Sequence, residues 1–235
     1  MIFVRSLLFI LVFYLWSTVL VIGCLPLTLG PRRWTLGAFR FWSRGVIVQL
    51  RLICAIKVEL RGREYMPKGR AIVAAKHQCM FDVFAQFAWL DDSCFVMRKE
   101  LMRIPFFNLY AWRAGTLVVD RDGGAKALRD MIAEARLRLK DPRQLVIFPE
   151  AHRGEPGVAG DYHPGVAGLS RDLELPTCPV ATNSGVHWPA HGFLRRPGTI
   201  VFEYLPPIPT GLKRAEYMRR LEAEIETGSN ALLGL

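Results

Sequence analysis

The chain has 235 residues, a hydrophobic fraction of 51% and a formal net charge of +10. This length allows one large domain, or one domain with an appendage. The positive charge lies almost wholly in residues 1–70, which carry 11 Lys and Arg against two acidic residues. A nucleic-acid-binding protein would normally carry a basic face on its folded body. A basic segment beside the most apolar sequence instead indicates an anionic membrane as partner, and no nucleic acid.

The cysteines argue against a disulfide framework and against a metal site. They are odd in number, are scattered along the chain and never form a C-x-x-C pair. This usage is typical of a reducing compartment. Only Cys79, which lies between His77 and Asp82, remains as an alternative nucleophile. The five cysteines are Cys24, Cys54, Cys79, Cys94 and Cys178.

The N-terminal segment has the composition of a membrane helix. Residues 7–25 form an almost unbroken apolar run, which is long enough to cross the hydrocarbon core as a helix. A cleaved signal peptide is the main alternative, but its apolar region would be shorter and no convincing cleavage site follows. One arginine precedes the run, and five follow it by residue 51. The positive-inside rule therefore predicts an inner (cytoplasmic) membrane location, with the remaining chain on the cytoplasmic side.

Residues 32–55 form a second, different segment that interleaves arginines with aromatic and aliphatic residues. Such a sequence suits a helix lying at the level of the lipid headgroups. We expect residues 1–55 to be a membrane-anchoring helical unit. The sequence leaves open whether this unit spans the membrane or dips as a hairpin into one leaflet.

From residue 56 to residue 235 the pattern becomes that of an α/β domain. Strand-like runs alternate with amphipathic segments, which predicts a mixed, largely parallel sheet flanked by helices. The expected strands are 57–61, 71–75, 93–98, 115–119, 144–148, 180–183 and 199–204, and the expected helices are 80–90, a short one from Pro105, 124–140 and a last one after Pro207.

His77 and Asp82 follow the strand at 71–75 and form a candidate dyad. Five positions turn an ideal helix by roughly 500°, so the two side chains cannot meet inside one regular helix. They can meet if His77 lies in the entry loop and Asp82 in the first helical turn, where a carboxylate is favoured. This is the arrangement of an oriented general base. The alternative is a surface histidine with an unrelated aspartate.

Reactive or basic side chains follow four of the expected strands. Because ligands gather at the carboxyl ends of strands in open α/β sheets, we expect one shared pocket for an anionic ligand. No phosphate-binding glycine loop and no G-x-S-x-G motif occurs, which disfavours a nucleotide site and a serine hydrolase. The four groups are His77 with Asp82, Lys99 with Glu100, Asp120 with Arg121, and Glu150 with Arg153.

Five blocks in order give the chain a family resemblance. They are KHQCMFD, AGTLVVDRD preceded by RKELMRIPFF, FPEAHR, YHPGVAGL and CPVATNSGVHW. Over roughly residues 55–230 the chain resembles the 1-acylglycerol-3-phosphate O-acyltransferases and related glycerolipid acyltransferases. The departures are Ala151 and His152 in the block usually written FPEGTR, His163 where lysine is common, and Lys76 where asparagine is commoner.

The resemblance implies a glycerol-phosphate acyltransferase-like fold and a membrane-bound enzyme without a cofactor. An acyl chain would move from acyl-CoA or acyl carrier protein to the sn-2 hydroxyl of 1-acyl-sn-glycerol 3-phosphate, giving phosphatidic acid. His77 would act as general base and Asp82 would orient it. The implied acceptor-binding residues are Arg121, Glu150, Arg153 and Lys99.

Three other functions stay open at this point. The same chemistry could act on a lyso-ornithine lipid or another lysophospholipid, which the departures at 151, 152 and 163 keep in view. The chain could also be an inactive protein that binds anionic lipids, although His77 and Asp82 are intact. Hydrolysis of acyl thioesters without an acceptor is the third.

Overall fold

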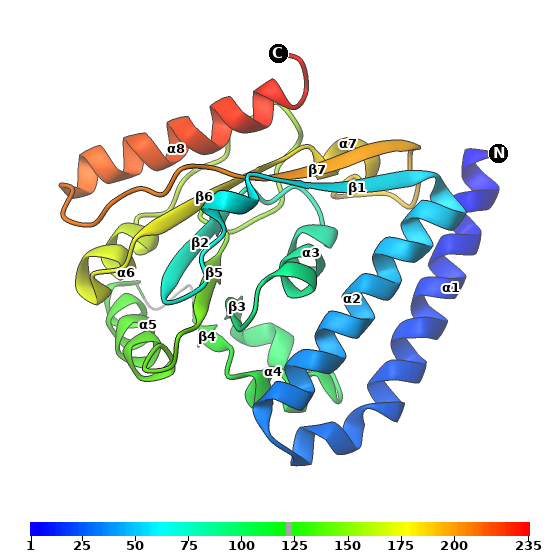
Figure 1. Ribbon diagram of the computed structural model, residues 1–235, viewed down its shortest axis with the longest axis horizontal. Helices are drawn as coiled ribbons and strands as arrows, with labels where there is room; N and C mark the ends of the chain where they lie inside the picture. Colours follow the sequence, from blue (N-terminus) through cyan, green and yellow to red (C-terminus); the bar gives the residue numbers. More distant parts are fainter. Residues whose placement is uncertain (121–123) are drawn as a thin grey trace.

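A seven-stranded sheet forms the centre of the computed structural model, which describes residues 1–120 and 124–235 (Figure 1). The strands are β1 (Ile56–Arg61), β2 (Ala71–Ala75), β3 (Ser93–Arg98), β4 (Leu117–Val119), β5 (Gln144–Ile147), β6 (Thr177–Thr182) and β7 (Gly198–Tyr204). The α-helices are α1 (Ile2–Gly23), α2 (Arg32–Cys54), α3 (Phe81–Trp89), α4 (Phe107–Ala114), α5 (Gly124–Arg138), α6 (Gly165–Leu173), α7 (Ser184–His187) and α8 (Arg214–Ala231). Short 3-10 helices are η1 (Leu25–Leu29), η2 (Arg63–Tyr65) and η3 (Lys99–Arg103).

The sheet is mixed and largely parallel, which confirms the predicted fold class. Its strand order is β1-β7-β6-β2-β5-β3-β4. Every neighbouring pair is parallel except β6 and β7, which are antiparallel. The strands from β6 to β4 therefore all point the same way, and their carboxyl ends meet at one edge of the sheet.

Two hydrophobic cores lie on opposite faces of this sheet. Alternate residues of β2 point into each: Val73 and Ala75 into the first core, Ile72 and Ala74 into the second. The first core includes side chains of α1, α2 and α3, and the second includes side chains of α5, α6 and α8. Because β2 is buried on both faces, its sequence AIVAA is apolar throughout, as is usual for a parallel strand.

The N-terminal helices α1 and α2 form an antiparallel pair beside the α/β body, residues 56–235 (Figure 1). Phe9 and Phe13 of α1 are buried in the first core. Near its start, α1 accepts a hydrogen bond from the backbone N–H of Arg195 at Ser6 Oγ (2.8 Å), and near its end the carbonyl of Val21 accepts one from Tyr110 (2.8 Å). The helix thus lies along the body over most of its length.

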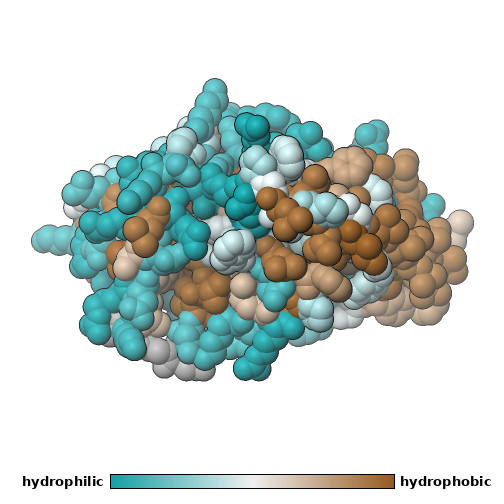
Figure 2. Space-filling model, turned by 90° about the horizontal axis from the view of Figure 1, so that it is seen from below, coloured by the Kyte–Doolittle hydropathy of each residue, from teal (hydrophilic) through white to brown (hydrophobic). Residues whose placement is uncertain are grey.

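The outer face of α1 is apolar and exposed. Within the described residues α1 is the one helix long and apolar enough to cross a membrane, and only 17% of its most apolar window is buried. A core helix of a water-soluble protein would bury most of this surface. Apolar residues accordingly gather on the side of the N-terminal helices in Figure 2, while the opposite side is hydrophilic.

The expected strands and helices of the α/β body are present with bounds shifted by a few residues, but α6 and α7 were not expected. Helix α6 has the sequence GVAGLSRDL, and its two glycines are poor helix formers. Packing on α5 explains the helix, because Val166, Ala167 and Leu169 of α6 are buried in the second core together with Met131 and Ala135 of α5. Tertiary contact thus overrides local propensity here.

A partly buried ion cluster holds the start of α2 to the body. Asp92 accepts hydrogen bonds from both terminal nitrogens of Arg32 (2.9 and 2.6 Å) and from Arg143 Nε (2.9 Å). The Arg143 side chain is only 2% exposed, and it also donates to the carbonyl oxygens of Ala114 (2.5 Å) and Gly115 (3.3 Å) at the end of α4.

We expect Arg143→Ala to lower the free energy of unfolding by about 3 kcal/mol, because it removes the donor to the buried carbonyl of Ala114 and one of the two arginines that bind Asp92. Denaturant unfolding of the full chain in detergent measures the change. The matched control is Arg61→Ala, which breaks an exposed pair with Glu59 and should change stability by no more than about 1 kcal/mol. Equal effects of the two variants would contradict a structural role for the cluster.

Candidate active site

The candidate active site lies at the edge where the carboxyl ends of the parallel strands meet. His77 follows β2, Glu150 follows β5 and Ser184 follows β6. Since β5, β2 and β6 are neighbours in the sheet, these three residues are brought together from distant parts of the sequence. This is the edge at which open α/β sheets hold their ligands.

His77 and Asp82 form the dyad geometry that their spacing allows. His77 lies in the loop before α3, Asp82 lies in the first turn of α3, and Nδ1 of the imidazole is 3.1 Å from Asp82 Oδ2. A proton on Nδ1 suits this contact and leaves Nε2 as the nitrogen that can accept another. The His77 side chain is 15% exposed, so the imidazole is not sealed from outside.

The carboxylate of Asp82 is completely buried and held by four donors besides the imidazole. The backbone N–H groups of Gln78 and Cys79 donate to Oδ2 at 2.6 and 2.7 Å. Ser184 Oγ donates to Oδ1 at 2.5 Å, and the Cys79 thiol makes a longer contact of 3.5 Å with the same oxygen. A buried carboxylate satisfied in this way has one orientation, and it therefore fixes the ring of His77.

The backbone of His77 is fixed separately by the loop that follows β5. Its N–H donates to Glu150 Oε2 (2.9 Å), and its carbonyl accepts from the N–H of Gly154 (2.8 Å). The imidazole stacks on Phe148, with ring centroids 4.3 Å apart and an interplanar angle of 27°. The FPEAHR block thus supports the histidine through both its backbone and its ring.

Behind Glu150 lies a buried charge network that the sequence did not predict. Lys76 Nζ donates to Glu150 Oε1 (2.7 Å), to Glu226 Oε1 (2.6 Å) and to the carbonyl of Val158 (3.1 Å). Glu226 belongs to α8 and also accepts from the hydroxyl of Tyr162 (2.8 Å). Lys76 had been noted only as a departure from the family pattern, and nothing in the sequence links it to a residue 150 positions away.

Glu150 therefore occupies a supporting position. It is 2% exposed, and both of its oxygens are engaged, one by Lys76 and one by the backbone of His77. The acceptor-binding role that the resemblance implies for Glu150 would require these buried bonds to break. We interpret Glu150 as a residue that positions His77.

The other predicted acceptor-binding residues are spread along the same edge. Lys99 follows β3, pairs with Asp120 after β4 and is exposed. Because β3 lies two strands from β2, Lys99 starts about 10 Å from the strand that leads to His77. Arg153 is exposed beside Gly154 and, in the described parts of the chain, pairs with no carboxylate. Arg121 lies outside the described residues.

Cys79 does not have the properties of a nucleophile. Burial, followed by the nearby negative charge of Asp82, raises the pKa of its thiol well above the ordinary value. The thiol therefore stays protonated at neutral pH, whereas the thiolate is the reactive form. Among the described residues, no group of three or more His, Cys, Asp or Glu side chains is placed to hold a metal ion.

Comparison with known proteins agrees with this arrangement. The family model described as Acyltransferase matches residues 57–183, which is more than half of the chain. The chain belongs to the acyltransferase family. The matched region contains the dyad, Lys76 and Glu150, and it ends one residue before Ser184.

Several relatives of this acyltransferase carry more specific names. A 1-acyl-sn-glycerol-3-phosphate acyltransferase of Pseudomonas aeruginosa is 29% identical over 201 residues, covering 84% of this chain and 77% of that protein. One of the same name from Escherichia coli is 30% identical over 164 residues, covering 66% of this chain and 63% of that protein. The fold matches the crystal structure of the 1-acyl-sn-glycerophosphate (LPA) acyltransferase, PlsC, from Thermotoga maritima with a TM-score of 0.82 over 100% and 99% of the two chains, at 22% identity.

One departure from the family pattern has a local structural consequence. Ala151 replaces the usual glycine and adopts a left-handed backbone with φ of 62°. Its N–H donates to the carbonyl of Phe148 (3.0 Å), which closes the turn after β5. An L-residue with a Cβ is strained in this region, whereas glycine is not.

Ala151→Gly should raise the free energy of unfolding by about 0.5–1 kcal/mol, because relief of the left-handed strain exceeds the extra flexibility of the unfolded chain. Denaturant unfolding in detergent measures this change. The matched control is Ala223→Gly on the exposed face of α8, which should lower stability by about 1 kcal/mol. A loss of stability in both variants would show that Ala151 is not strained.

Cys79→Ala should reduce the rate of acyl transfer by less than about tenfold, since it removes packing and a weak contact but no proton-transfer group. Release of free thiol from an acyl-CoA by the full-length protein measures the rate. A loss as large as that caused by replacing His77 would make a thiol intermediate necessary.

Proposed function

We propose that this acyltransferase transfers an acyl chain from acyl-CoA or acyl carrier protein to the sn-2 hydroxyl of 1-acyl-sn-glycerol 3-phosphate. The products are phosphatidic acid and the free thiol. The observation that carries the proposal is the His77–Asp82 contact, which leaves Nε2 available at the carboxyl edge of the sheet. The names of the relatives, all acting on 1-acyl-sn-glycerol 3-phosphate, support this acceptor.

In the proposed mechanism His77 acts as general base and then as general acid. Nε2 takes the proton of the acceptor hydroxyl as its oxygen attacks the thioester carbonyl. The resulting tetrahedral intermediate expels the thiolate, which receives that proton from the imidazolium. Asp82 stabilises the imidazolium while it exists. No covalent acyl-enzyme forms, so the protonated thiol of Cys79 needs no role.

Stabilisation of the oxyanion must come from groups other than the first amides before α3. The N–H groups of Gln78 and Cys79 already donate to Asp82 and are not free for a substrate oxygen. These two amides at the start of the helix therefore do not stabilise the oxyanion directly. Their effect is indirect, through the carboxylate that orients His77.

Arg153 is our first candidate for binding the acceptor phosphate. It is exposed, and the adjoining N–H of Gly154 bonds to the carbonyl of His77, which brings the arginine to the same edge as the dyad. A guanidinium suits a phosphate because it donates two parallel hydrogen bonds. Lys99, which follows β3 at this edge, would add to the cationic surroundings, and Arg121 remains part of the proposed acceptor-binding set.

Membrane attachment fits this chemistry, because the acceptor and the product are both lipids. The exposed apolar face of α1 supports attachment. Ser6 and Val21, near opposite ends of α1, both bond to the α/β body, so a spanning α1 would draw that body into the hydrocarbon core. We therefore propose that α1 lies in the cytoplasmic leaflet of the inner membrane, with the α/β body on the cytoplasmic side.

A second candidate acceptor is a lyso-ornithine lipid or another lysophospholipid. The histidines at positions 152 and 163 support this second acceptor, since both residues lie in the loop that supports His77. Their rings are 6.0 Å apart, and both residues are exposed. Imidazoles here would present a different acceptor surface from the threonine and lysine that are usual at these positions.

His77→Ala should reduce thiol release about 10³-fold in the presence of lysophosphatidate, because it removes the group that accepts the hydroxyl proton. The measurement uses full-length protein in membranes, a long-chain acyl-CoA, and reactions with and without lysophosphatidate. Asp82→Asn should cause a comparable loss, because an amide does not stabilise the imidazolium.

His191→Ala is the matched control, since His191 is exposed in a loop outside the dyad. It should keep wild-type thiol release. Release that does not depend on lysophosphatidate would indicate thioester hydrolysis, and release only with a phosphate-free lysolipid would favour the second acceptor. Unchanged release by His77→Ala would show that the dyad assignment is wrong.

A further inference from the structure

The segment from η3 through α4 exposes an unusual number of large apolar side chains. Trp112 is 66% exposed and Phe106 is 50% exposed. Monomeric soluble proteins rarely gather such side chains unless the surface binds something. We call this surface the η3–α4 face; it consists of Leu101, Ile104, Phe106, Leu109 and Trp112.

The backbone of Phe106 holds its ring outward at a conformational cost. Its φ of 63° and ψ of −36° are rare for any residue with a side chain, and especially for a bulky aromatic. Strained residues of this kind persist where the strain serves a purpose. Here the strained residue presents an aromatic ring to the outside.

The η3–α4 face continues the exposed surface of α1. The hydroxyl of Tyr110 on α4 bonds to Val21 at the end of α1, and Arg113 Nε donates to the carbonyl of Gly30 (2.8 Å) just after η1. Leu29 of η1, which is 88% exposed, lies next to this second contact. Figure 1 accordingly shows α4 beside the turn between α1 and α2.

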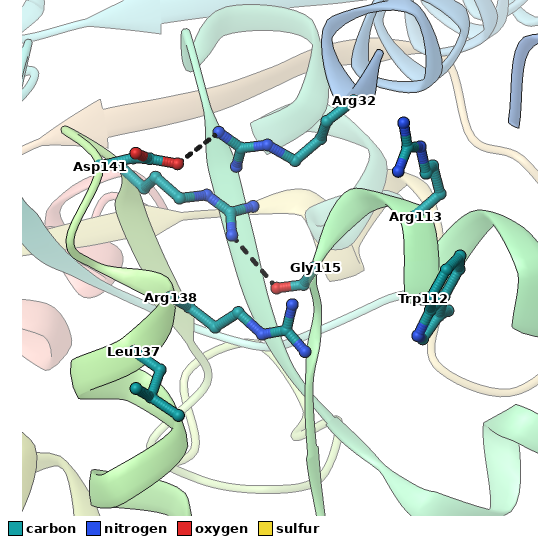
Figure 3. A pocket seen from close by; sticks show the side chains of 8 residues that line it. Arg32, Trp112, Arg113, Gly115, Leu137, Arg138 and Asp141 are labelled. Carbon is teal, nitrogen blue, oxygen red and sulfur yellow. Dashed lines mark hydrogen bonds and ion pairs between the residues drawn. The ribbon is translucent and has the colours of Figure 1, made fainter. Parts of the chain in front are cut away.

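A cavity of about 290 Å³ adjoins the face and is lined by four arginines. Figure 3 shows Arg138 extending from α5 across this cavity toward Trp112 and Arg113 on α4. Arg32 and Arg143 are engaged by carboxylates, but Arg138 uses only Nε, in an exposed pair with Glu134. Within the described residues the terminal nitrogens of Arg138 are therefore available to an anion.

This cavity is separate from the candidate active site. Gly115 and Arg143, which line it, lie one or two residues before the amino ends of β4 and β5, whereas His77 lies beyond the carboxyl end of β2. The sheet thus separates the two sites. A ligand of the arginine cavity is not the acceptor bound at the dyad.

We infer that the η3–α4 face is a second membrane contact, which docks on an anionic phospholipid leaflet while the arginine cavity receives the phosphate of a lipid headgroup. Apolar and aromatic side chains next to arginines have the composition of a membrane interface. The inference rests on the proposed membrane-bound function and deepens it. Helix α1 alone would leave the protein free to rotate about the helix axis, and a contact beside that axis removes this freedom.

Two substitutions test the contact in the full-length protein. Phe106→Gly keeps the left-handed backbone and removes the ring, and it should weaken partition into phosphatidylcholine vesicles, with or without phosphatidylglycerol, by about fivefold or more. Arg138→Gln should weaken partition about fivefold, but only into vesicles that contain phosphatidylglycerol. Leu235→Ser and Arg171→Gln, which change an exposed apolar and an exposed basic residue elsewhere, are the matched controls and should partition like wild type.

Hydrogen exchange locates the contact. Vesicles should slow amide exchange in residues 99–114 as well as in α1. Slowing confined to α1, together with wild-type partition of both variants, would overturn the inference. Inorganic phosphate alone is the second arm: if it protects residues 111–115 as strongly as vesicles do, the cavity binds free phosphate and the lipid assignment is wrong.

The membrane contact and the proposed reaction can be tested separately. Thiol release with a short-chain lysophosphatidate in true solution does not require a membrane surface, and Phe106→Gly should leave that rate unchanged while it lowers vesicle partition. If Phe106→Gly loses this rate, its fold is damaged, and vesicle partition of Arg138→Gln together with hydrogen exchange of the wild-type protein then decides the inference. Absence of the rate in wild type would count against the proposed reaction only.

Discussion

The buried carboxylate of Asp82 is the interaction on which the candidate site depends. A carboxylate without solvent must be satisfied by donors, and here those donors come from the loop after β2, from the imidazole of His77 and from Ser184 after β6. Satisfying one group therefore fixes the relative positions of three segments. The imidazole is oriented as a consequence, which is the requirement for a general base.

The network of Lys76, Glu150 and Glu226 fixes the backbone of His77. Glu150 bonds to the His77 backbone with one oxygen and to Lys76 with the other, and Lys76 reaches Glu226 on α8. Removal of Lys76 would leave the buried carboxylate of Glu150 without a cation, which is costly. The side chain of His77 is thus positioned by Asp82 and its backbone by Glu150, through two networks that meet at this residue.

The sequence predicted those contacts of the site that join residues close together in the chain. His77 and Asp82 are five residues apart, so elementary helix geometry already limited how they could meet. Strand alternation likewise predicted the sheet, because apolar runs and turns are local patterns. Ser184 and Glu226 lie 102 and 150 positions from their partners, and no local pattern encodes such pairs. Helix α6 was missed for a related reason, because its glycines gain their helical state from packing on α5.

The boundary near residue 55 separates two kinds of sequence, but the hydrophobic core crosses it. Phe9 of α1 packs edge-on against Trp188, with ring centroids 5.4 Å apart, and Trp188 stacks on Phe81 at 5.8 Å. Phe81 directly precedes Asp82 in α3. Three rings therefore connect the apolar N-terminal helix with the first turn that carries the dyad carboxylate. Because packed interiors transmit small displacements, α1 is part of the scaffold of the site as well as its proposed anchor. An enzyme built in this way would hold its catalytic edge at a fixed height and angle to the leaflet from which a lipid acceptor arrives.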